Sequence, residues 1–380
     1  MDRFIECIAG AYAGGAIGDA MGAPLEGWGP ERIRTRYPAP VVETFIPPQH
    51  IAPDGTYGKG SGRITDDTLM SEALIDAYIA AGDHLDAHGW ATHVLPNLCD
   101  RSVFVPERQR EMPLVERLWW PEKYPYIRMR HGNVDPRSAG VGNCVNCGIA
   151  MYAWPTGAIN AGDPVGAYHE AASWAMAHNE SFAVEAAAVM AAASAAAFGD
   201  GGLPAVLSAA RDLARDGTKA AVAACLDAVD QNDPFQRAIA RIRSAVAPYD
   251  QRTGHVSDDA PLAQPNASDL GRPSRLASIE ELPVALAALA WGGDDWRRVL
   301  GLAVWYGRDN DSIAGMALGL WGAIHGLAAL PATLVQESKQ VNRRDYRAAA
   351  GRLAATARAI QTRDAQRLAA RNRAMGAADA

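Results

Sequence analysis

The sequence predicts an all-α fold, because helix-like patterning covers most of its 380 residues and strand signals are scarce. Ala, Leu and Met recur at helical spacing, β-branched runs are few, and residues 41–45 are the one modest strand candidate. In chain order, the predicted helices cover residues 3–22, 68–81, 163–177, 180–198, 204–215, 218–229, 234–247, 280–290, 294–305, 311–326 and 341 to about 375.

Two of these helices, 3–22 and 311–326, carry glycine at helical spacing. Glycine costs a helix interior about 1 kcal/mol relative to alanine, so a stripe of glycine needs a reason. Loose packing is one explanation, but a stripe on a single face favours close backbone approach between two central helices. The glycines are Gly14, Gly18 and Gly22 in the first helix, and Gly315, Gly319, Gly322 and Gly326 in the second.

Two acidic clusters lie more than two hundred residues apart, each where a glycine-containing loop leads into a helical segment. They are Thr-Asp-Asp-Thr at residues 65–68 and Asp-Asn-Asp-Ser at residues 309–312. Helix capping explains one side-chain oxygen at such a position. Each cluster offers more, and adjacent carboxylates repel one another unless a cation lies between them. Because carboxylates and hydroxyls are ligands for Mg²⁺, Ca²⁺ or Mn²⁺, the clusters predict a shared metal site.

The composition excludes some classes of partner. The net charge of −7 argues against nucleic acid or an anionic membrane surface, since both require a basic face. No apolar run of signal length follows Met1, and no stretch of about 18 apolar residues predicts a membrane span. We therefore expect a cytoplasmic protein with a small molecule as its main partner.

The five cysteines fit reduced thiols in that compartment. Cys144 and Cys147 form a lone C-x-x-C, without the second pair that a tetrahedral zinc site requires. We interpret both as small, polarisable residues that line a site.

Three segments depart from the helical pattern. Residues 100–141 are rich in aromatic and basic side chains and read as a long loop, while residues 248–278 are rich in Pro, Ser, Asp and Gly. The tail after Tyr346 is rich in Ala and Arg and predicts a solvated helix. We expect a single domain over residues 1–340 with these two loop insertions, followed by a C-terminal surface helix over 341–380.

Several motifs together resemble the ADP-ribosylglycohydrolase family, which includes the dinitrogenase reductase-activating glycohydrolases. Residues 14–26, which read GGAIGDAMGAPLE, are similar to the opening motif of that family. The cluster at 65–68 is similar to its first metal motif, and GRDNDSIAG at 307–315 is similar to its second.

Between these motifs, residues 142–151 lie where the family has a glycine- and asparagine-rich substrate segment. His178 falls where a histidine commonly contacts the ligand. The match runs in order over residues 8–326, and four ordered motifs make the resemblance specific.

The resemblance implies a compact, orthogonal multi-helix fold with a dinuclear metal site at its centre. Two Mg²⁺ ions are expected there, with Mn²⁺ as a possible substitute. The metal ligands implied by the resemblance are Thr65, Asp66, Asp67, Asp309, Asp311 and Ser312.

The resemblance also implies catalytic and substrate-binding residues. Glu26 would lie over the metals as a gate or acid–base residue, although an exposed glutamate after a proline turn is the alternative. His178 is equally compatible with a purely structural role. The catalytic residues implied are Glu26, Asp66 and Asp67, and the substrate-binding residues are Asn143, Asn146, Gly148 and His178.

The activity implied is magnesium-dependent hydrolysis of the anomeric N- or O-ribosyl bond of an ADP-ribosylated protein or small molecule. The sequence departs from the family at Ser312, where threonine is usual, and at Tyr152, where arginine often follows the methionine. Two cysteines and Ile149 also alter the substrate segment. Hydrolysis of a simpler ribosyl or nucleoside-like compound, or binding of ADP-ribose without turnover, therefore remain alternatives, and the oligomeric state stays open.

Overall fold

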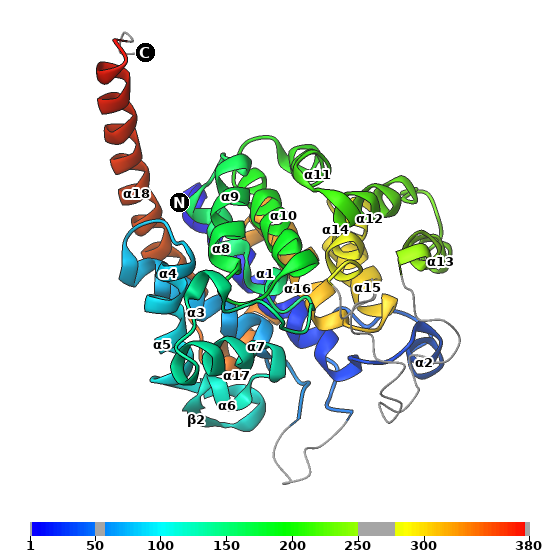
Figure 1. Ribbon diagram of the computed structural model, residues 1–380. Helices are drawn as coiled ribbons and strands as arrows, with labels where there is room; N and C mark the ends of the chain where they lie inside the picture. The colour runs from blue at the N-terminus through cyan, green and yellow to red at the C-terminus, as the bar shows by residue number, and fades with distance from the viewer. Residues whose placement is uncertain (1, 50–57, 250–277, 377–380) are drawn as a thin grey trace.

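The computed structural model describes residues 2–49, 58–249 and 278–376. Helices pack at varied angles around a buried centre, and the only sheet within the described residues has two strands, so the predicted all-α class is confirmed (Figure 1). The helices and strands in chain order are α1 (Arg3–Gly22), α2 (Pro30–Arg36), α3 (Asp66–Ala81), α4 (Ala87–Gly89), α5 (Leu95–Cys99), β1 (Ser102–Val105), β2 (Arg110–Pro113), α6 (Leu114–Arg117), α7 (Trp120–Tyr126), α8 (Trp154–Ile159), α9 (Pro164–Ala175), α10 (Ser181–Ala197), α11 (Gly202–Leu213), α12 (Asp216–Asp227), α13 (Phe235–Val246), α14 (Glu281–Gly292), α15 (Trp296–Tyr306), α16 (Asn310–His325), α17 (Ala332–Asn342) and α18 (Tyr346–Ala374).

The centre of the molecule is the antiparallel pair α1 and α16 (Figure 1). A Cβ atom on Gly10 would overlap the backbone of Gly322, and one on Gly22 would overlap the backbone of Asn310. Between these ends, Gly18 lies against the carbonyl of Ala314. The predicted close approach of the two glycine-bearing helices is confirmed, and it brings the end of α1 to the start of α16.

The start of α3 is attached to this pair by a buried side chain of α1. Asp19 accepts hydrogen bonds from the Thr65 backbone N–H at 2.9 Å and from the Thr68 hydroxyl at 2.5 Å. These bonds satisfy donors at the first turn of α3 that have no partner within the helix. Three helix ends therefore meet at one place.

An outer layer of apolar helices surrounds the central pair. α10 packs against α8, α9 and α11, and α14 and α15 pack against α16 (Figure 1). Along α10 a run of alanines allows close packing on both sides, and every residue of α14 is buried. None of the described helices combines the length and apolarity that crossing a lipid bilayer requires.

The interpretation of residues 100–141 as a long loop is wrong for much of its length. β1 and β2 form an antiparallel hairpin that pairs Ser102 with Pro113 and Val105 with Arg110, and α6 and α7 follow it directly. Phe104 of β1 is buried on this hairpin, and pairing with β2 keeps this short segment in a regular strand conformation. Conversely, residues 41–45 form no strand. Residues 248–278, the other predicted insertion, lie almost wholly outside the described residues.

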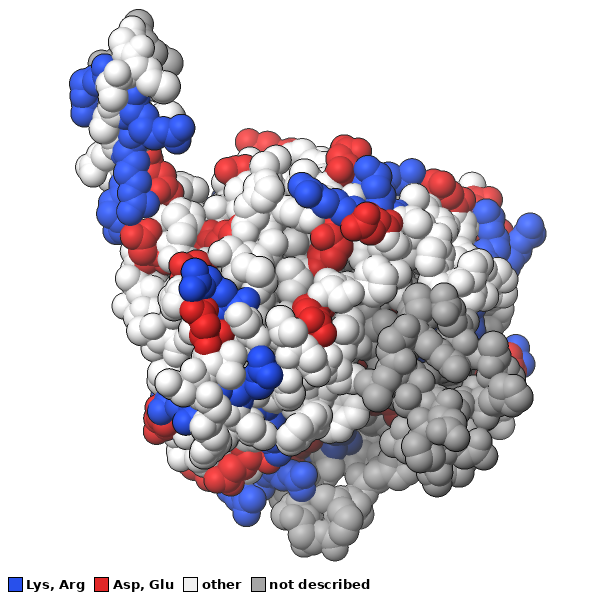
Figure 2. Space-filling view, in the orientation of Figure 1, with Lys and Arg blue, Asp and Glu red and all other residues white. Residues whose placement is uncertain are grey.

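The predicted helix over 341–375 corresponds to α18, which begins a few residues later, and the preceding helix α17 was not predicted. Arg343 has a φ of +57° and ends α17, and α18 then begins at Tyr346 with Asp345 as its cap. The first half of α18 packs on the body, where residues such as Leu353 and Ile360 are buried. Its second half projects from the body and carries arginine side chains (Figures 1 and 2).

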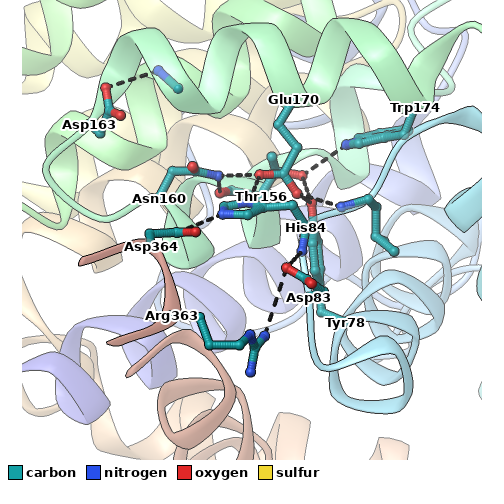
Figure 3. A network of polar contacts seen from close by, with 12 residues as sticks. Tyr78, Asp83, His84, Thr156, Asn160, Asp163, Glu170, Trp174, Arg363 and Asp364 are labelled. Atoms are coloured by element: carbon teal, nitrogen blue, oxygen red, sulfur yellow. Dashed lines mark hydrogen bonds and ion pairs between the residues drawn. The ribbon is translucent and has the colours of Figure 1, made fainter. Parts of the chain in front are cut away.

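A polar network holds α18 where it leaves the body (Figure 3). His84 contacts Glu170 of α9 through Nδ1 at 2.5 Å and Asp364 of α18 through Nε2 at 2.9 Å. Glu170 also accepts from the Tyr78 hydroxyl at 2.8 Å and from Asn160 Nδ2 at 2.6 Å. These contacts link three helices that are distant in sequence.

Candidate active site

The two acidic clusters converge at the junction of α1, α3 and α16. Asp19, Asp67 and Asp311 each offer a carboxylate oxygen, and these atoms lie within 4.8 Å of one another. Glu26, Asp309 and Asp311 form a second such group. Asp311 belongs to both groups, so the carboxylates form one continuous cluster.

The loop that carries Glu26 is fixed to the second acidic cluster by backbone hydrogen bonds. The Gly27 N–H donates to the Arg308 carbonyl at 2.7 Å, and the Arg308 N–H donates to the Trp28 carbonyl at 2.8 Å. Gly307 has a φ of +84°, and a Cβ there would overlap the Trp28 carbonyl. Glycine is therefore required where the two loops approach each other.

Burial and mutual repulsion disfavour ionisation of these carboxylates. Burial, together with the nearby Asp311 charge, raises the pKa of Asp67 well above its usual value and that of Asp19 to about 7. Burial and Asp309 raise the pKa of Asp311 to about 6, although Lys59 opposes the shift. Oδ1 of Asp67 is buried without a hydrogen-bond partner. The hard oxygen donors, the orphaned oxygen and the excess negative charge fit a divalent cation.

Lys59 provides a positive charge within this cluster. Its ammonium group forms an ion pair with Glu26 and lies 3.3 Å from Oδ2 of Asp311. Burial would lower the pKa of Lys59, but Glu26 and Asp311 outweigh that effect and raise it well above its usual value. The lysine therefore stays charged between two carboxylates.

Asp66 has a different environment from its neighbour Asp67. Nη1 of Arg117 lies 2.8 Å from Oδ1 of Asp66, and the same guanidinium pairs with the buried Glu107. Burial would raise the pKa of Asp66, but Arg117 and Lys59 together lower it. Asp66 is consequently ionised and held in one orientation by a residue of α6.

These groups line a cavity of about 330 Å³ that opens at one side of the cluster. Of the predicted site residues, those lining the cavity are Glu26, Asp66, Asp67, Asn146, Gly148, Asp309, Asp311 and Ser312. The other lining residues are Lys59, Arg117, Leu118, Trp119, Glu122, Cys147 and Met151.

Three of the predicted site residues do not line the cavity. Thr65 is buried beneath it and donates from Oγ1 to Oδ2 of Asp67 at 3.1 Å. Asn143 uses its amide to donate to two carbonyls, those of Pro121 at 2.7 Å and His178 at 2.8 Å. Both residues therefore hold the shape of the site from behind.

His178 lies in the aromatic core, which corrects the expectation that it contacts a ligand. Its Nδ1 lies 2.7 Å from the Tyr152 hydroxyl, and its ring lies close to those of Tyr152 and Trp90. Burial lowers the pKa of His178 to about 3, so the ring is neutral. Its Nε2 is buried without a hydrogen-bond partner among the described residues. The contacts of Nδ1 and the ring favour the structural role that the sequence position also allows.

Cys147 is a lining residue, as interpreted from the sequence, whereas Cys144 is not. The Cys147 thiol donates to Oδ2 of Asp309 at 2.8 Å and lies 3.5 Å from the Ser312 hydroxyl. Burial raises the pKa of this thiol well above its usual value. Cys147 is thus protonated, and it acts as a donor to a carboxylate of the second cluster.

Sequence reasoning missed four charged groups of the site: Asp19, Lys59, Arg117 and Glu122. Asp19 could have been found from the sequence, because it lies on the glycine-bearing face of a buried helix. A carboxylate is rarely placed there without a partner. Lys59 and Arg117 lie in segments whose patterns showed no motif. Only the folded chain places them beside the acidic clusters.

Comparison with known proteins agrees with this fold. A family model described as ADP-ribosylglycohydrolase matches residues 1–363. This chain belongs to the ADP-ribosylglycohydrolase family, and it is accordingly a hydrolase of glycosidic bonds.

Two relatives illustrate the range of the similarity. The uncharacterized protein YegU of Escherichia coli (strain K12) is 26% identical over 344 residues, which covers 90% of this chain and 94% of that protein. A solved structure titled ADP-ribosylglycohydrolase-related protein complex superposes with a TM-score of 0.61 at 20% identity, and the match covers 94% of this chain and 100% of the other. At that identity the likeness concerns the fold.

Proposed function

We propose that this protein is a magnesium-dependent hydrolase that cleaves the anomeric N- or O-ribosyl bond of an ADP-ribosyl conjugate. The observation that supports it is the meeting of Glu26, Asp67 and Asp311 at one cavity in a chain of this family. A bound cation stabilises carboxylates that repel one another, and a ribose diol is a suitable further ligand for it.

The residues that would hold the metal are those of the two acidic clusters, with Asp19 behind them. Mg²⁺ or Mn²⁺, when bound, would grip the ribose diol and lower the pKa of a coordinated water. Asp66 and Asp309 line the cavity beside this position, and Ser312 adds a hydroxyl. Thr65 would contribute through its contact with Asp67.

Bond cleavage builds positive charge on the anomeric carbon. The bond from that carbon to the leaving nitrogen or oxygen breaks, a water oxygen replaces it, and the leaving group takes up a proton. Glu26 is the group proposed to accept the proton of the attacking water, since its carboxyl is only partly exposed at the cavity and contacts Lys59. Burial, with the charge of Asp311, raises the pKa of Glu26, which brings its basicity closer to neutral pH.

The segment around Tyr152 favours a second candidate, a ribosyl compound that has less phosphate. Tyr152 is fully buried against His178 and Trp90 and supplies no cation to the cavity. The two cations that line it, Lys59 and Arg117, are already paired with carboxylates. A diphosphate would therefore have to compete with Glu26 and Asp66 for them.

A substrate panel tests the proposal. The protein is incubated with ADP-ribosyl-arginine, an ADP-ribosyl-serine peptide, O-acetyl-ADP-ribose and several nucleosides, each with Mg²⁺ and with chelator. We expect one class of substrate to release its ribosyl product, and to do so only when Mg²⁺ is present. In Glu26→Gln we expect this release to be lost while Mg²⁺ binding is retained. If ADP-ribose binds in a magnesium-dependent manner but nothing is cleaved, the protein is a binding protein and the proposed activity is wrong.

A further inference from the structure

One wall of the cavity comes from the two short helices that follow the hairpin, and it has no counterpart among the motifs that resemble the family. This wall, defined here as Arg117, Leu118, Trp119 and Glu122, lies at the junction of α6 and α7. Arg117 is committed to Asp66 and Glu107. One carboxylate oxygen of Glu122 has no hydrogen-bond partner among the described residues, and Trp119 is largely exposed, so these two groups are left to meet a ligand.

Glu122 is a buried carboxylate with one unused oxygen. Its residue is 3% exposed, Oε1 accepts from Nδ2 of Asn146 at 2.9 Å, and Oε2 is buried with no hydrogen-bond partner. A Cβ on Gly148 would overlap Oε1, so a glycine makes room for this carboxylate. A buried acceptor without a hydrogen-bond partner destabilises the folded state, so this oxygen calls for an explanation.

The orientation of Asn146 leaves Oε2 as the available atom. Oδ1 of Asn146 accepts from Nδ2 of Asn179 at 3.1 Å, which directs the amide nitrogen of Asn146 toward Glu122. Nδ2 of Asn179 also donates to the Cys144 carbonyl at 3.0 Å. The amide of Asn146 is thus held by Asn179 and donates to Oε1 of Glu122. A donor to Oε2 must come from another group.

Trp119 gives this wall a flat apolar surface. Its side chain lines the cavity while the residue is 54% exposed. Trp120 is similarly exposed at 56%, but it does not line the cavity and packs edge-on against Tyr124 with ring centroids 6.5 Å apart. The two neighbouring tryptophans therefore form a matched pair, of which one faces the site.

The charge at the cavity limits what can bind here. Glu26, Asp66, Asp67, Glu122, Asp309 and Asp311 line it, against the two cations Lys59 and Arg117. An anionic group beside Glu122 would add repulsion, whereas an N–H donor, neutral or cationic, would satisfy Oε2. A planar group that carries such a donor would also stack on the Trp119 indole.

We propose that Glu122 and Trp119 form a specificity subsite for a flat, nitrogen-rich group of the ribosyl substrate, which donates an N–H to Glu122 Oε2 and stacks on Trp119. This inference rests on the proposed function for the rest of the ligand. Two parts of a substrate share this chemistry: an adenine base with its exocyclic amine, and a guanidinium leaving group.

Fragment binding tests the subsite without requiring turnover. The full-length protein with Mg²⁺ is titrated by ligand-observed NMR with 9-methyladenine and with methylguanidinium. Their controls are N6,N6-dimethyl-9-methyladenine and hexamethylguanidinium, which are of the same class but lack the N–H donor. The variants are Glu122→Gln, Trp119→Ala and the matched control Trp120→Ala.

We expect one of the two N–H fragments to bind, and its affinity to fall about tenfold or more in Glu122→Gln, where a donor replaces the acceptor Oε2. Trp119→Ala weakens the same fragment about tenfold, Trp120→Ala leaves it unchanged, and the fully methylated control binds weakly to every variant. The fragment that responds identifies whether the subsite takes the base or the leaving group. Melting temperatures verify that the variants are folded.

The proposal is overturned if neither N–H fragment binds the parent protein at millimolar concentration, or if binding is the same in Glu122→Gln and the parent. If Glu122→Gln does not fold, the Trp119→Ala and Trp120→Ala pair and the methylated fragments still decide the matter. N–H-dependent fragment binding without any ribosyl hydrolysis would contradict the proposed function alone. Hydrolysis that is indifferent to Glu122 and Trp119 would contradict the subsite alone.

Discussion

The Lys59 ammonium lies between Glu26 and Asp311, where it balances part of the charge that a divalent ion would balance. Asp67 has a raised pKa and an orphaned oxygen, so this one cation does not satisfy the whole cluster. A bound metal ion would therefore compete with Lys59 for the same carboxylates. The site therefore contains more carboxylate oxygens than the protein's own cations and hydrogen-bond donors satisfy.

Replacing Lys59 with glutamine should change stability and metal binding in opposite directions. Without Mg²⁺, we expect a lower melting temperature, because repulsion between Glu26 and Asp311 increases. With Mg²⁺, we expect binding to be about tenfold tighter, since a competing charge is gone. Thermal melts and calorimetric titration of Lys59→Gln measure both effects. An unchanged or weaker Mg²⁺ affinity would show that Lys59 does not compete with the metal.

Among the elements, α1 and α16 determine where the site forms. Their close packing brings Gly22 beside Asn310, and Asp19 then attaches the start of α3 to the same place. The carboxylates converge because the ends of three helices converge. Backbone contact, rather than side-chain packing, sets this geometry.

Alanine substitution of glycine tests that packing. In Gly18→Ala the new methyl group would overlap the Ala314 backbone, and we expect a loss of about 3 kcal/mol in the free energy of unfolding. Gly351, in α18, has open space around its Cβ position, so Gly351→Ala should gain about 0.5–1 kcal/mol. Chemical denaturation of the two variants provides the comparison. Equal effects at both positions would contradict close contact.

Much of this arrangement was predictable from the sequence, for identifiable reasons. Glycine spacing predicted the contact of α1 and α16, and the acidic clusters predicted that residues 65–68 and 309–312 share a site. The hairpin β1–β2 was missed because short strands depend on their partner for stability, and local pattern does not reveal the partner. Lys59 was missed because its role exists only through contacts with residues distant in the chain.

Across the whole molecule, contacts of α18 link the C-terminal part of the chain to its N-terminal part and to the body. Arg347 pairs with Glu6 and Arg358 with Asp2, both of α1 or its cap, while His84 links Asp364 to Glu170. One turn further along, Arg367 pairs with Asp83, and the rest of the helix projects from the body (Figure 1). The His84 contacts therefore link α18 to α9 near the point where the helix leaves the body (Figure 3).

This link predicts a pH dependence of stability. The hydrogen bond to Glu170 outweighs burial and, with Asp364, raises the pKa of His84 to about 9. A raised histidine pKa stabilises the folded state below its unfolded value of about 6.5, and this contribution disappears as the pH rises through about 9. We expect the melting temperature of the parent to fall over that range more steeply than that of His84→Gln. Parallel curves would mean that His84 is not charged in the folded protein.

The proposed activity depends on the joint binding of divalent ions by two segments separated by more than two hundred residues. Calorimetric titration of Mg²⁺ into the parent, Asp67→Asn, Asp311→Asn and the control Asp76→Asn tests it most directly. Asp76 also lies on α3 but pairs with Arg101 outside the candidate site. We expect two ions to bind the parent and Asp76→Asn, and binding to be at least a hundredfold weaker, about 2.7 kcal/mol, in each of the other variants. Unchanged Mg²⁺ binding in both Asp67→Asn and Asp311→Asn would contradict it.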